Sequence, residues 1–153
     1  MSRLELKVPP DVVWLFVAAL MWLASMKTPR LAVPSAFRLA LAVVLTSAGV
    51  WTIVSARLAL ERAHTSWRPM TPGKTTSLVT SGVYGISRNP IYLGMLLVIL
   101  GLAVALASPA ALVLSALFVL FIDRFQIRPE ERALSAILGQ EYLDYVRRVR
   151  RWV

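Results

Sequence analysis

The stretch from Ile91 to Ile122, IYLGMLLVILGLAVALASPAALVLSALFVLFI, contains no charged residue, and only Ser108-Pro109 interrupts it. The two apolar runs on either side, Ile91 to Ala107 and Ala110 to Ile122, have the composition of membrane helices. A two-residue connection brings the second helix back alongside the first. We therefore predict a tight antiparallel helical hairpin in which both helices cross a membrane.

The composition of the whole chain supports a membrane protein. Of its 153 residues, 58% are hydrophobic, whereas soluble domains average roughly 45–50%. The absence of Cys and the single His exclude disulfides and a multi-histidine metal centre within one chain, and we expect no metal. A net charge of +9 is typical of nucleic-acid binding in a soluble protein, but no basic stripe is interleaved with aromatic residues. The length fits a single domain, residues 1–153.

Two more apolar runs precede the hairpin, and each is bounded by basic residues. Residues 12–27 are short for one crossing, and a signal peptide is the alternative reading of this run. Residues 35–60 have Arg38 and Arg57 near their ends and no charge between them. We predict an all-α membrane protein with about four transmembrane helices, at 12–27, 35–60, 91–107 and 110–125.

Basic residues are distributed unequally between the two sides that four crossings define. The N-terminus, the connector 57–90 and the tail hold 14 of the 17 Lys and Arg residues, and the other side holds Lys27, Arg30 and Arg38. Cytoplasmic loops carry the excess of Lys and Arg. We expect a multi-pass protein with the connector, the tail and both termini in the cytoplasm.

The tail from Pro129 to Val153 has apolar residues at helical spacing and charges elsewhere, which predicts an amphipathic helical segment. Gly139 is expected to divide it into two short helices. The final residues, 147–152, contain four arginines and a tryptophan and are typical of an anchor on anionic lipid.

The segment 78–94 is rich in turn-forming residues and leads directly into the third apolar run. Asn89 fits a helix N-cap and Pro90 the first helical position. The free amides and the positive helix end at this point suit a carboxylate ligand. The alternative is that Asn-Pro only starts the helix, with Arg88 and Tyr92 as anchors at the membrane interface.

Glu130 and Glu131 follow the fourth run directly, after Pro129. One reading is an acidic first helical turn, favoured by the helix dipole. The other is that one carboxylate binds the ammonium or ribose hydroxyls of a cofactor. Adjacent helical residues point about 100° apart, so the two glutamates should have different roles. Arg128 is suited to a substrate carboxylate or, alternatively, to the membrane surface.

These motifs together resemble the isoprenylcysteine carboxyl methyltransferase family and the related phospholipid methyltransferases, which are integral membrane enzymes that use S-adenosylmethionine. The resemblance covers about residues 60–152, with Asn89 where the family usually has His and Val83 where Pro is usual between Gly82 and Tyr84. It implies a cofactor site formed by segments 78–94 and 128–134, with Arg128 and Glu131 as catalytic residues. The cofactor-binding residues that it implies are Leu78, Val79, Gly82, Tyr84, Arg88, Asn89, Pro90, Tyr92, Leu93, Glu130 and Glu131.

The resemblance implies methyl transfer to a lipophilic acceptor, a lipid, small molecule or prenylated protein, at the cytosolic membrane face. A carboxylate acceptor is favoured because no residue stands out as a general base. The alternatives are N- or S-methylation of a phospholipid or small molecule, or a non-catalytic membrane scaffold; a homodimer would supply spans that a short chain lacks. We also expect segments 78–92 and 128–134 to form opposite walls of one cavity, with Asn89 and Glu131 within reach of one ligand and residues 134–145 as a lid.

Overall fold

A computed structural model describes residues 5–64 and 78–153 of the chain. All the regular structure in these residues is helical, as predicted. The elements are α1 (Pro10–Ser25), α2 (Ser35–Arg62), the short 3-10 helix η2 (Gly82–Gly85), α3 (Pro90–Leu106), α4 (Pro109–Ile122), the π-helical turn η3 (Asp123–Ile127), α5 (Arg128–Leu138) and α6 (Gln140–Arg148).

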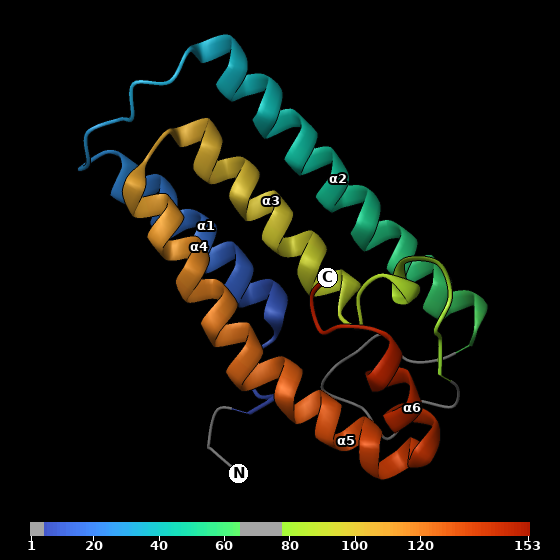
Figure 1. Cartoon of the computed structure of the whole chain (residues 1–153). Helices are drawn as coiled ribbons and strands as arrows, with labels where there is room; N and C mark the ends of the chain where they lie inside the picture. Colours follow the sequence, from blue (N-terminus) through green and yellow to red (C-terminus); the bar gives the residue numbers. More distant parts are fainter. Residues whose placement is uncertain (1–4, 65–77) are drawn as a thin grey trace.

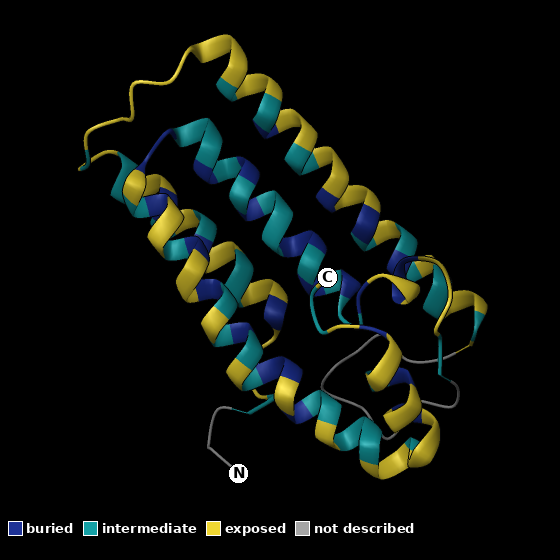
Figure 2. Cartoon of the chain, in the orientation of Figure 1, coloured by how far each residue is buried: buried dark blue, intermediate teal, exposed yellow. Residues whose placement is uncertain are grey.

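The four apolar helices α1 to α4 lie side by side, with α3 between α2 and the pair α1 and α4 (Figure 1). Much of the outward surface of α1, α2 and α4 is exposed (Figure 2). Large apolar residues of these helices are among the exposed ones, including Phe16, Val43 and Leu120 at 61–65%. An apolar outer surface of this extent suits lipid rather than water. By length and composition, α2 and the continuous helix Pro109–Leu138 are candidates to cross a membrane, whereas α1 and α3 are shorter. Crossing by all four helices stays a prediction.

The predicted hairpin between α3 and α4 is present. Ala107 adopts a left-handed conformation (φ 49°), and the Ser108 side chain accepts a hydrogen bond from the Ala111 amide at the start of α4. The connection between α1 and α2 joins this end of the bundle, because the Thr28 and Ser108 hydroxyl oxygens lie 3.0 Å apart. The hairpin therefore returns the chain to the end of the bundle from which α3 started.

Two glycines of α3 allow it to pack closely against α2. A Cβ atom on Gly94 would lie 2.6 Å from the Gly49 carbonyl oxygen, and one on Gly101 would overlap the Thr46 hydroxyl. Neither helix has room for a larger side chain at these points. The close packing fixes the position of α3 along the axis of α2, including that of its N-terminus.

The chain does not restart a helix at Pro129, which corrects the reading of Glu130 and Glu131 as a free first turn. Residues Pro109–Leu138 form one continuous helix, and Ile127 before α5 is itself helical. Pro129 has no N–H to donate to the Phe125 carbonyl, and its ring crowds that carbonyl. The helix widens at this point into η3, where the Arg128 amide bonds to the Asp123 carbonyl. The two glutamates therefore do not meet an open helix end.

The polar segments gather at the opposite end of the bundle from the hairpin turn (Figure 1). Gly139 (φ 55°) separates α5 from α6, as predicted, and lets the chain fold back. Tyr145 is buried in a cluster with Leu78 and Leu134, and its hydroxyl donates to the Tyr84 carbonyl at 2.7 Å. Residues 78–84, α5 and α6 therefore meet in one cluster.

Candidate cofactor site

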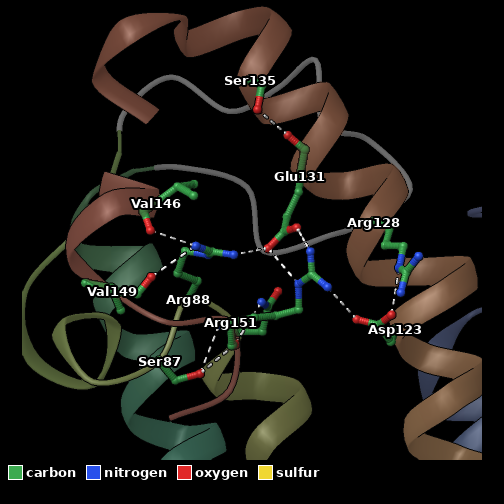
Figure 3. Close-up of polar contacts among 10 residues, drawn as sticks. Ser87, Arg88, Asp123, Arg128, Glu131, Ser135, Val146, Val149 and Arg151 are labelled. Carbon is green, nitrogen blue, oxygen red and sulfur yellow. Dashed lines mark hydrogen bonds and ion pairs between the residues drawn. The ribbon is translucent and has the colours of Figure 1, made fainter. Parts of the chain in front are cut away.

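The two segments singled out in the sequence, 78–92 and 128–134, are in direct contact. An Arg88 guanidinium nitrogen lies 2.8 Å from a Glu131 carboxylate oxygen (Figure 3). One helical turn further along α3, the Tyr92 hydroxyl donates to Glu130 at 3.0 Å. Segments separated by more than 30 residues in the sequence thus meet through two adjacent glutamates.

Arg88 is held almost entirely inside the protein, with 9% of its side chain exposed. In addition to Glu131, it donates to the carbonyl oxygens of Val146 and Val149, both at 3.0 Å. Its Nε–H is buried and has no hydrogen-bond partner in the described part of the chain. An unpaired buried donor is unfavourable, and an acceptor atom of a ligand would satisfy it.

Glu131 is the centre of an ion-pair network (Figure 3). Its two carboxylate oxygens accept from Arg88 and, at 2.6 and 3.2 Å, from Arg151. Arg151 also contacts Asp123 at 2.9 Å, and these carboxylates raise the arginine's pKa. Two arginines saturate most of the carboxylate's acceptor positions. The geometry therefore suits Glu131 to positioning its neighbours rather than to holding a ligand.

Glu130 has a different environment from its neighbour. Among the described residues, its carboxylate has one hydrogen-bond partner, Tyr92, and no arginine. Burial raises the pKa of Glu130 to about 7; the Tyr92 hydrogen bond lowers it and the nearby Glu131 raises it. The residue lies in the polar helix α5, beyond the uncharged α4. A carboxylate that burial brings close to neutrality gains by pairing with a cation.

Asn89 occupies the N-cap position of α3, as predicted, but its side chain does not cap the helix. It donates instead to the Arg151 carbonyl at 3.1 Å, and the Ser87 hydroxyl accepts the Asn89 amide. The Arg88 amide donates to the Arg150 carbonyl at 3.0 Å. The end of the tail therefore runs along residues 87–89 and uses the polar groups that were predicted to face a ligand.

Arg151 and Asp123 belong to the site, although the sequence reading did not place them there. Arg151 was expected on the lipid surface with Arg147, Arg148 and Arg150, which are exposed. It is only one-third exposed and points into the network. The sequence resemblance to the methyltransferase families extends to residue 152 and so includes Arg151, and this was the feature that could have placed Arg151 in the site.

The remaining predicted residues surround this network at different distances from it. Arg128 is half-exposed and pairs with Asp123 at 2.7 Å, on the outer side of α5. Leu78 packs against the cluster that contains Tyr145, and Val79 and Tyr84 pack on Ala56. Gly82 (φ 61°) begins η2. Buried Pro90 begins α3, which also contains Leu93. Burial raises the pKa of the Tyr84 hydroxyl.

The donor and acceptor set fits one end of a zwitterionic ligand. Glu130 supplies a carboxylate for a cationic group, and the Arg88 Nε–H supplies a donor for a carboxylate; Arg88 contacts the residue next to Glu130. Within the described residues, no group of three His, Asp or Glu side chains is arranged to hold a metal ion. The Arg88, Tyr92 and Glu130 side chains can take part in ion pairs and hydrogen bonds with such a ligand.

A family model described as phospholipid methyltransferase matches residues 37–141, which include Arg88, Tyr92 and both glutamates. Proteins named protein-S-isoprenylcysteine O-methyltransferase match about half of the chain: 43% identity over 75 residues in mouse and 41% over 75 residues in Saccharomyces cerevisiae. These alignments cover 26% and 30% of those proteins. An uncharacterized Haemophilus influenzae protein is matched along its whole length at 38% identity. No solved structure matches the chain.

Proposed function

The chain belongs to the phospholipid methyltransferase family, and from this premise we propose that it transfers a methyl group from S-adenosylmethionine to a lipophilic acceptor. Members of the family are membrane methyltransferases that use this methyl donor. Bound S-adenosylmethionine supplies a methyl group activated by a positively charged sulfur. The protein's own task is to bind, orient and shield the reactants.

The observation that carries the proposal is the hydrogen bond from buried Tyr92 to partly buried Glu130 at the polar end of the bundle. Glu130 is the carboxylate that remains for the ammonium of the methionine part, because two arginines already hold Glu131. The unpaired Arg88 Nε–H suits the carboxylate of the same part. We assign cofactor binding to Arg88, Tyr92 and Glu130, and positioning to Glu131.

The acceptor that we favour is a carboxylate on a lipid-like molecule. A carboxylate is already deprotonated at neutral pH, so its methylation needs no general base. The names of the curated relatives point the same way, although the chain matches only a quarter to a third of their length. The description of the family model favours a second candidate, the headgroup of a phospholipid.

We place the site at the cytosolic membrane face. The polar end of the bundle holds the N-terminal segment, residues 78–89 and the tail, and the sequence concentrates its Lys and Arg in these parts (Figure 1). The positive-inside rule assigns that end to the cytosol. An acceptor dissolved in the membrane would reach this end from the lipid.

The test is a transfer assay with radiolabelled S-adenosylmethionine and the purified protein in lipid nanodiscs. One acceptor is an S-farnesylated N-acetylcysteine, its control is the same compound as a carboxamide, and the second acceptor is phosphatidylethanolamine. We expect base-labile label on the free acid only, and at least about tenfold less of it with the Glu130→Gln variant when S-adenosylmethionine is below saturation. Label on phosphatidylethanolamine alone would assign the phospholipid function instead. A protein that binds no methyl donor would overturn both.

A further inference from the structure

The N-terminal residues Glu5 to Val8 contact the π-helical turn η3 at three points. The Leu6 amide donates to the Phe125 carbonyl at 3.1 Å. The Gln126 side chain donates to the Val8 carbonyl at 2.7 Å. Glu5, whose side chain is 5% exposed, pairs with Arg124 at 3.0 Å and Arg132 at 2.8 Å. Each contact joins residues 5–8, which lie outside the region 37–141 that the family model matches, to residues inside that region.

The first of these contacts replaces a bond that the helix cannot make. In a regular helix the Phe125 carbonyl would accept from the amide four residues later, but that residue is Pro129. Leu6 supplies the missing donor from outside the helix. The Phe125 carbonyl is thereby satisfied and the widened turn is stabilised.

Glu5 joins the widened turn to the helix that follows it. Arg124 lies within η3, and Arg132 lies in α5 on the other side of Pro129. A carboxylate that pairs with both arginines holds the two parts of the helix at a fixed angle and rotation. Gln126 is fully buried, so its bond to Val8 adds a second fixed point next to Phe125.

The rotation of α5 decides which side chain faces α3. A π-helical turn accommodates one extra residue, and one residue corresponds to about 100° of helical rotation. If η3 relaxed to a regular helix, Glu130 would turn away from Tyr92. We infer that Glu5, through the segment Glu5–Val8, is a positioning residue that keeps Glu130 directed toward Tyr92 and so sets the affinity for the methyl donor. This inference rests on the proposed function for its ligand only.

The first test measures S-adenosylhomocysteine binding by calorimetry for wild type, Glu5→Gln, Tyr92→Phe and the double variant. We expect Glu5→Gln to weaken binding about tenfold, and Tyr92→Phe to cause no further loss in that background. The matched control is Asp11→Asn, another N-terminal carboxylate paired with an arginine, Arg57 at 3.9 Å; it should bind within twofold of wild type. Wild-type affinity of Glu5→Gln, or multiplying effects in the double variant, would overturn the inference.

The second test needs no ligand, so it separates this inference from the proposed function. The chain has no Cys, so Tyr92→Cys with Glu130→Cys can be crosslinked by a short bis-maleimide. Thr28→Cys with Ser108→Cys, at the other end of the bundle, is the control pair. Adding Glu5→Gln should lower the yield of the first pair several-fold and leave the control pair unchanged. Equal yields for the first pair with and without Glu5→Gln would overturn the positioning role, whatever the ligand.

Discussion

Replacing the adjacent glutamates by Gln, one at a time, should have very different consequences for stability. Glu131→Gln removes the charge that compensates Arg88, which is 9% exposed, and Arg151, which is 33% exposed. Removing one partner of a buried ion pair costs about 3–5 kcal/mol, and we expect the lower end because Glu131 itself is 15% exposed. Glu130→Gln leaves no arginine unpaired and can still accept from Tyr92. At pH 8 it also removes a carboxylate whose ionised form burial disfavours, so its unfolding free energy should not fall and should lie at or above that of wild type.

The assay is unfolding of the purified protein in mixed micelles at pH 8, followed by circular dichroism as a denaturing detergent is added. Glu141→Gln is the control, because Glu141 is exposed on α6. Glu131→Gln should lose about 3 kcal/mol, Glu141→Gln should match wild type, and Glu130→Gln should be at least as stable as wild type. Equal destabilisation by Glu130→Gln and Glu131→Gln would refute the division of roles between the two glutamates.

Three further predictions concern pH and packing. The pKa of Glu130 is raised to about 7 in the folded state. The folded state therefore binds more protons than the unfolded chain between about pH 5 and 7. The melting temperature should fall as pH rises through this interval, and Glu130→Gln should reduce this dependence on pH. Gly101→Ala should cost about 1–3 kcal/mol in detergent unfolding, because the new methyl group meets Thr46; an unchanged midpoint would contradict the packing. Tyr145→Phe leaves the Tyr84 carbonyl without its donor and should lower the unfolding free energy by about 1–3 kcal/mol.

The features that the sequence predicted well depend on neighbours in the chain. Ser108-Pro109 between two uncharged runs was enough for the α3–α4 hairpin, and Asn89-Pro90 for the start of α3. Gly139 ended α5 because its positive φ favours a residue without a side chain. Because the hairpin returns the chain to the end of the bundle where α3 begins, segments 78–92 and 128–134 have to lie close together.

The features that were missed depend on partners far away in the sequence. Pro129 was expected to begin a helix, but a donor from Leu6 allows the helix to continue through it. No local pattern shows that residue 6 lies beside residue 125. Arg151 was read as a lipid anchor because its neighbours are basic, whereas the tail folds back and pairs it with Glu131 and Asp123.

Equilibrium binding of radiolabelled S-adenosylmethionine to the purified protein, compared between wild type and Glu130→Gln, tests the central claim most directly. A hydrogen bond to a charged group contributes about 1.5–3 kcal/mol, which corresponds to roughly 10- to 100-fold in affinity. The account predicts saturable binding by wild type and a loss of that size in Glu130→Gln, with the fold unchanged by circular dichroism. Equal binding by both proteins, or no binding by wild type at millimolar ligand, would contradict it.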